Sequence, residues 1–61
     1  MEPEIISRIL NGQRWFWYVY YDALLRRREV GVFQTRTAAR DAALDDTAVL
    51  DALTRRQTVG R

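Results

Sequence analysis

The stretch Arg14-Trp15-Phe16-Trp17-Tyr18-Val19-Tyr20-Tyr21 decides the fold of this chain. It holds both tryptophans, all three tyrosines and one of the two phenylalanines. Aromatic and β-branched side chains favour a strand, and turn-forming residues bound the run, so we expect a β-strand here. Side chains alternate along a strand, which gives a tryptophan face with Trp15, Trp17, Val19 and Tyr21 and, opposite, a tyrosine face with Phe16, Tyr18 and Tyr20. Both faces are apolar, so a helix on one side leaves the other for a partner.

Two further strands are expected around this one. Ile5–Leu10 precedes Asn11-Gly12, and Asn-Gly between apolar runs is a strong hairpin signal. After Asp22 and a short connection comes the segment of residues 26–33. We expect its later part to form a third strand, with Gly31 as a candidate bulge or close-approach site.

The length of the hairpin loop sets the register of the first two strands. A three-residue loop, Asn11-Gly12-Gln13, places Ile5 and Ile9 on the tryptophan face and leaves Arg8 and Arg14 on the tyrosine face. A two-residue loop instead places Ile6, Arg8 and Leu10 with the tryptophans, because a slip of one residue moves every side chain to the other face. We prefer the three-residue loop, since it gathers the long aliphatic side chains with the tryptophans.

A helix is expected from Arg36 to about Arg56, with Thr35 as its N-cap. A stripe of small residues suits close packing on the bulky tryptophans, and it comprises Ala38, Ala39, Ala42 and Ala43. Val49, Leu50 and Leu53 form a second apolar patch. Asp45-Asp46-Thr47 leaves two alternatives open: one long helix, or a break at which Asp46 or Thr47 caps a second helix.

The expected fold class is therefore α+β: a three-stranded antiparallel meander with one C-terminal helix, broken or unbroken near Asp46, on one face. Residues 1–61 form a single domain, and residues 57–61 are expected to fray. Such a short chain buries little apolar area against the entropy of folding. We therefore expect a homodimer, through the spare aromatic face or through the Val49, Leu50 and Leu53 patch.

The composition excludes several function classes. There is no cysteine and no histidine, which removes disulfides, the usual zinc sites and Cys–His or Ser–His catalysis. We expect no enzyme activity, no cofactor, no metal and no small-molecule substrate. The acidic start, Met1-Glu2-Pro3-Glu4, is no targeting signal, and no apolar run approaches the ~20 residues of a membrane span. A soluble, cytoplasmic protein without membrane contact is expected.

The charges are arginine-based and unevenly distributed. The chain has ten arginines, no lysine, eight acidic residues and a net charge of +2. Arginines dominate residues 7–37, whereas aspartates dominate residues 38–53. The run Arg26-Arg27-Arg28 fits either a solvated edge that prevents aggregation or a patch that contacts phosphates.

Residues 13–43 resemble the arm-type DNA-binding domain of phage integrases and related small phage and bacterial β-β-β-α domains. The matching positions are Trp15 in an aromatic strand, then Phe33, Thr35 and Ala39 at the step into the helix. The resemblance implies a three-stranded sheet whose exposed face enters the DNA major groove. The chain departs from the family where Thr37 and Ala38 replace an acidic residue, and where aromatic residues replace a polar groove-reading face.

Two functions are expected. The first is protein–protein interaction through an aromatic and arginine-rich sheet face, for example in an inhibitor of a host or defence protein such as an anti-CRISPR. The alternative is binding of DNA or RNA by the same face, with arginines on phosphates and aromatic rings on bases. The candidate binding residues for either partner are Arg8, Arg14, Phe16, Tyr18, Tyr20, Arg26, Arg27 and Arg28.

Overall fold

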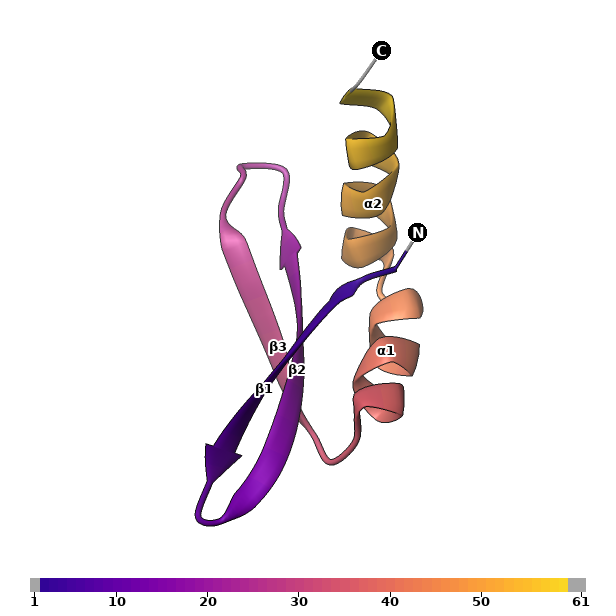
Figure 1. The fold of residues 1–61 in the computed structure, drawn as a ribbon. Coiled ribbons are helices and arrows are strands. Elements are labelled where there is room, and N and C mark those ends of the chain that lie inside the picture. Colours follow the sequence, from indigo (N-terminus) through magenta and orange to yellow (C-terminus); the bar gives the residue numbers. More distant parts are fainter. Residues whose placement is uncertain (1, 60–61) are drawn as a thin grey trace.

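Three antiparallel strands precede two helices in the computed structural model (Figure 1). The strands are β1 (Glu4–Leu10), β2 (Gln13–Tyr21) and β3 (Arg27–Phe33), and the helices are α1 (Arg36–Leu44) and α2 (Thr47–Val59). The structure describes the main chain of residues 2–59 and the side chains of residues 2–55. The sheet order β1-β2-β3 makes it a meander. The predicted α+β class is confirmed.

The long helical segment divides where its sequence left two alternatives open. Thr35 is the N-cap of α1, and its hydroxyl accepts a hydrogen bond from the Ala38 amide at 3.0 Å. α1 ends at Leu44, and the Asp46 carboxylate then accepts the Ala48 amide at 2.9 Å, which caps α2. Two helices therefore replace the single one. α2 extends to Val59, and the rest of the tail predicted to fray, residues 60 and 61, lies outside the described residues.

The hairpin between β1 and β2 has a two-residue loop. Leu10 pairs with Gln13, so only Asn11 and Gly12 lie between the strands. Their φ angles are 53° and 77°, and two positive φ values define the type I′ turn that matches the twist of a hairpin. The preferred three-residue loop is wrong, because Asn-Gly fits the two positions of this turn and leaves Gln13 to pair in the strand.

The helices cover the tyrosine face. Tyr18 packs with Ala43 of α1 and Val49 of α2, and Ile5, Val30 and Phe33 pack against this cluster. Both helices lie on the same side of the sheet (Figure 1). The expectation that the alanines pack on the tryptophans is therefore wrong. Since both faces of β2 are apolar, the pattern of β2 could not distinguish them; the two-residue loop brings Ile5 onto the tyrosine face.

The second apolar patch belongs largely to the same core. Val49 is buried, Leu53 packs against the core cluster, and Leu50 remains exposed. The patch is therefore not available as a whole for dimerisation. No helix in the described part of the chain is long and apolar enough to cross a membrane.

Candidate functional site

The tryptophan face is the side of the sheet opposite the helices. The register brings Ile6 beside Trp17 and Arg8 beside Trp15, and both tryptophans are half-buried. Leu10, at the hairpin end of β1, is also exposed on this face. Around Trp15 and Trp17 the face thus combines two indoles with aliphatic side chains and an arginine, and both helices lie on the other side of the sheet (Figure 1). Farther along β2, Val19 is buried.

Arg8 is held in place on this face by two neighbours. Its guanidinium lies 5.1 Å from the centroid of the Trp17 ring, within cation–π range. It also donates to both carboxylate oxygens of Glu29 on β3, at 3.0 and 3.3 Å. Glu29 pairs with Arg27 as well. Arg8 therefore crosses β2 from one edge strand to the other, over the tryptophan ring.

Gly31 makes room for Trp17 on the same face. The β2–β3 register shifts between Phe16 and Tyr18, so β3 has a bulge around Gly31 and Val32. A Cβ placed on Gly31 would lie 2.8 Å from Cγ of Trp17, closer than atoms can pack. The predicted role of Gly31 as a bulge and a close-approach site is confirmed. Trp17 is thus held between Gly31 and Arg8.

The predicted binding residues do not gather on one surface. Those on the tryptophan face are Arg8 and Arg27. Those on the tyrosine face are Arg14, Phe16, Tyr18, Tyr20 and Arg28. Tyr18 is only 5% exposed, and Phe16 and Tyr20 are half-buried. The expectation that Tyr18 lies exposed is therefore wrong, because the helices cover it, whereas Phe16 and Tyr20 keep part of their surface exposed.

Carboxylates partly neutralise the arginine run after β2. Asp22 accepts hydrogen bonds from the side chains of Arg26 and Arg28 at 3.0 and 2.9 Å, and Arg27 pairs with Glu29. Asp22 also accepts the main-chain amides of Leu24 and Arg26, each at 2.9 Å. The bond from the Arg26 amide is the largest of the causes that lower the pKa of Asp22 to about 2. Arg26, Arg27 and Arg28 thus stabilise the turn and its flanks, and their charges are already paired.

Two other arginines lie beside Phe16, Arg14 on β2 and Arg36 at the start of α1. Arg14 donates to the Ser7 hydroxyl at 2.8 Å, and the Arg36 guanidinium lies 5.5 Å from the centroid of the Phe16 ring. Within residues 2–55, neither forms an ion pair with a carboxylate. They are the arginines best placed to attract an anion.

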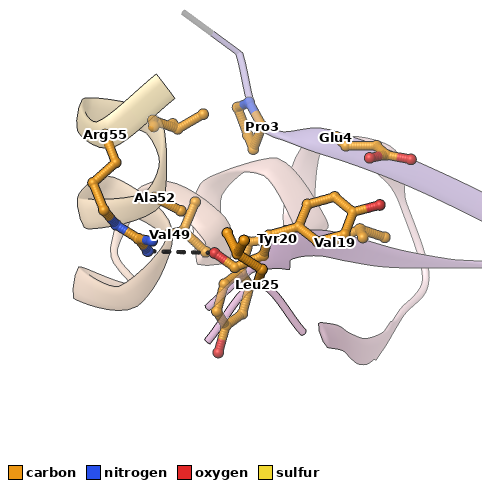
Figure 2. Close-up of a pocket in the computed structure, with 10 residues that line it drawn as sticks. Pro3, Glu4, Val19, Tyr20, Leu25, Val49, Ala52 and Arg55 are labelled. Atoms are coloured by element: carbon orange, nitrogen blue, oxygen red, sulfur yellow. Dashed lines mark hydrogen bonds between the residues drawn. The ribbon is translucent and has the colours of Figure 1, made fainter. Parts of the chain in front are cut away.

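A pocket of about 620 Å³ lies between α2 and the end of the sheet (Figure 2). Val49, Ala52 and Leu53 of α2 form one wall, and Val19, Tyr20 and Tyr21 of β2 form another; Pro3, Glu4, Leu25 and Arg55 complete the lining. Arg55 donates to the Tyr21 carbonyl at 3.4 Å, which joins the two walls (Figure 2). The pocket has the size of many ligand sites, and its lining is mostly apolar.

The described part of the chain holds no group of three or more metal-ligating side chains. Sequence reasoning missed that the helices lie on the opposite side of the sheet from the tryptophans, and the signal that could have revealed it was the preference of Asn-Gly for a two-residue turn. The pocket gave no sequence signal, because it depends on how α2 sits against β2.

No protein-family model, no curated protein and no solved structure matches this chain. The resemblance to integrase arm domains therefore stays a prediction.

Proposed function

We propose that this chain is a small non-catalytic binding module that docks a protein partner on its tryptophan face. The observation that carries the proposal is the position of Trp15, Trp17 and Arg8 on the sheet face opposite the helices. Tryptophan and arginine are enriched among the residues that dominate binding energy at interfaces. This sheet face carries both residue types, and the helices already cover the opposite face. These features support the binding of a protein partner.

The charges around this face support a protein partner over a polyanion. Arg8 and Arg27 share the carboxylate of Glu29, so the face offers mixed and partly satisfied charge. Binding to a nucleic acid depends on arginines that neutralise phosphates. A mixed rim around an aromatic centre is typical of protein interfaces.

The specific form that we propose is an inhibitor of a host or defence protein, such as an anti-CRISPR. A standard interface takes about 800 Å² from each partner, a substantial part of the 4508 Å² that this chain exposes. One such surface is enough for a protein that acts by covering another protein's site.

A comparison of two variants tests the proposed face. Trp15→Ala removes an indole from the face, whereas Leu24→Ala removes an equally apolar side chain from the β2–β3 turn. Proteins retained from a host lysate by the immobilised wild-type chain are identified, and their affinities are then measured with purified components. We expect Trp15→Ala to weaken binding by about 30-fold or more, as at a hot spot, with little effect of Leu24→Ala. If both variants bind equally well, the partner does not use this face.

Nucleic-acid binding is the second candidate, and Arg14 and Arg36 are the observation that favours it. Both lie beside Phe16 at the end of the sheet near the hairpin, without a carboxylate partner in residues 2–55. Fluorescence anisotropy with a DNA duplex, a DNA single strand and a structured RNA tests this function. It predicts binding that weakens steeply with salt and that Arg14→Gln reduces. Affinity that is unaffected by salt would rule it out.

A further inference from the structure

β1 is an edge strand, and no strand among the described residues pairs with its outer side. It lies at one edge of the sheet, and it pairs with β2 in a regular register along all seven residues, Glu4–Leu10. The other edge strand, β3, is interrupted by the bulge near Gly31. Bulges, prolines and inward-turned charges are the usual means by which proteins prevent edge strands from pairing. β1 contains neither a bulge nor a proline, and its inward-reaching charge, Arg8, is already paired with Glu29 of the same sheet.

The hairpin turn determines which main-chain groups face outward. In a two-residue turn, the flanking residues Leu10 and Gln13 form a hydrogen-bonded pair. Hydrogen-bonded pairs alternate along an antiparallel ladder, so Arg8, Ile6 and Glu4 also direct their amides and carbonyls at β2. The amides and carbonyls that point away from the sheet are therefore those of Ile5, Ser7 and Ile9.

The polar side chains of β1 do not shield these groups. Arg8 reaches inward across the sheet to Trp17 and Glu29, and the Ser7 hydroxyl is bonded to Arg14 on β2. Toward the hairpin, the strand exposes apolar side chains instead: Ile9 is 62% exposed and Leu10 is 49% exposed. The free edge thus combines unpaired main-chain groups with uncovered aliphatic surface.

We propose that β1 pairs antiparallel with β1 of a second copy of this chain, around a two-fold axis at Ser7. In this register Ser7 faces Ser7 of the second copy, and Ile5 faces the second copy's Ile9. All three outward-facing residues then pair, with about six main-chain hydrogen bonds. Each exposed Ile9 is covered by an isoleucine that already packs on a core. The two sheets become one sheet of six strands.

The charges on the tryptophan face fit this pairing of identical strands. Glu4 lies opposite Leu10 of the second copy, and the second copy's Arg8 is its diagonal neighbour, within reach of a long side chain. Arg8 itself lies opposite Ile6 of the second copy, so no like charges meet. A two-fold pairing requires this self-complementarity, because every contact occurs twice. The inference does not rest on the proposed function, although it would place two tryptophan faces side by side.

The oligomeric state and one pair of variants test the proposal. Analytical ultracentrifugation over a range of concentrations should show a reversible monomer–dimer equilibrium. Ile9→Lys places a charge at the paired edge, and Leu24→Lys makes the same change at an exposed leucine of the β2–β3 turn. Ile9→Lys should raise the dissociation constant about tenfold or more, while Leu24→Lys should leave it unchanged.

A cysteine cross-link locates the contact independently of Ile9. The chain has no cysteine, so Ser7→Cys introduces a single thiol at the expected two-fold axis. Hydrogen-bonded residues that face each other have Cα atoms about 5.5 Å apart, within the range of a disulfide. Ser7→Cys should therefore oxidise to a covalent dimer faster than Leu24→Cys. A wild-type chain that stays monomeric at high concentration, equal effects of both lysine variants, or faster cross-linking from position 24 would each overturn the proposal.

Discussion

Tyr18 joins the sheet to the helices through one hydroxyl group. The hydroxyl donates to the Asp46 carboxylate at 2.7 Å, and the same carboxylate caps α2 at the Ala48 amide. Burial, with the hydrogen bond to Asp46 as a further cause, raises the pKa of Tyr18 to about 12. One side chain of β2 thereby fixes the point at which the helical segment turns.

Replacing Tyr18 by phenylalanine removes this bond and leaves the ring in the core. We expect Tyr18→Phe to lower the free energy of unfolding by about 1–2 kcal/mol, since a hydrogen bond to a charged group is lost. Tyr20→Phe is the matched control, because Tyr20 packs against the core and its hydroxyl has no such bond to any side chain of residues 2–55. Urea denaturation of both variants checks the difference. Equal stability of the two would contradict the role of the Tyr18 hydroxyl.

The same residue predicts a loss of stability in alkali. The pKa of Tyr18 is raised from 10.0 to about 12 in the folded chain, so folding favours the neutral phenol. This contribution is complete below pH 10.0 and is lost as the pH rises toward 12. Thermal unfolding across this range should show a fall in Tm for the wild type that is reduced in Tyr18→Phe.

Asp22 predicts a loss of stability in acid. Its carboxyl has a pKa lowered from 3.8 to about 2, so folding favours the ionised form. The contribution is present above pH 3.8 and is lost as the pH falls toward 2. Asp22→Asn should lower Tm at neutral pH and flatten this acid slope. Asp51→Asn, which breaks a surface pair with Arg55, should change the neutral Tm less. An unchanged acid slope in Asp22→Asn would contradict the assignment.

At the scale of elements, the β2–β3 turn holds one residue in an unfavourable conformation. Leu25 has a φ of 62°, in the left-handed region that costs a non-glycine residue about 1–2 kcal/mol. Its side chain is 77% exposed, so little packing is lost by removing it. Leu25→Gly should stabilise the protein by about 0.5–1 kcal/mol after the added chain entropy of glycine.

Leu24 provides the control for this prediction. It lies in the same turn and is 71% exposed, but its φ is not positive. Leu24→Gly should therefore destabilise by about 0.5–1 kcal/mol, since glycine adds entropy without relieving strain. Chemical denaturation at one protein concentration compares the two. The same sign for both variants would show that the conformation of Leu25 carries no strain.

The strands and helices could be predicted from the sequence, but the side of the sheet on which the helices pack could not. The aromatic run, Asn-Gly and Thr35 identify local structure, because each depends on the preferences of a few neighbouring residues. The side of the sheet that the helices cover depends on long-range packing of Tyr18 with Ala43 and Val49. Choosing the register by gathering aliphatic side chains gave greater weight to an assumed core than to the geometry of the turn.

At the scale of the whole molecule, the pocket is a space that the packing of α2 against the sheet leaves unfilled. Ala52 lines this pocket and is otherwise buried, whereas Ala39 is fully buried and does not line it. Ala52→Leu should fill part of the space and stabilise by about 0.5–2 kcal/mol. Ala39→Leu should destabilise the protein by about 1–3 kcal/mol, because the larger side chain would overpack a filled core. Thermal unfolding measures both, and destabilisation by Ala52→Leu would mean that the pocket cannot accept a side chain.

The sequence could predict which kinds of residue form the candidate site, but not on which face of the sheet they lie. The sequence identified Arg8 and an aromatic strand as binding elements, and both remain in the proposal. It assigned Tyr18 to the surface, because alternation along a strand separates two faces without saying which one is inside. The pairing of Asp22 with Arg26 and Arg28 was also missed, since a turn closed by one carboxylate depends on main-chain conformation.

The position of Trp17 has a consequence for the affinity of any complex formed on its face. Gly31 and Arg8 confine the indole before a partner arrives, so its rotational freedom is already lost in the free protein. Immobilising a side chain on association otherwise costs about 0.5–1.5 kcal/mol. Because the indole is ordered during folding, a complementary surface that reaches it would bind with a smaller loss of entropy and therefore more tightly.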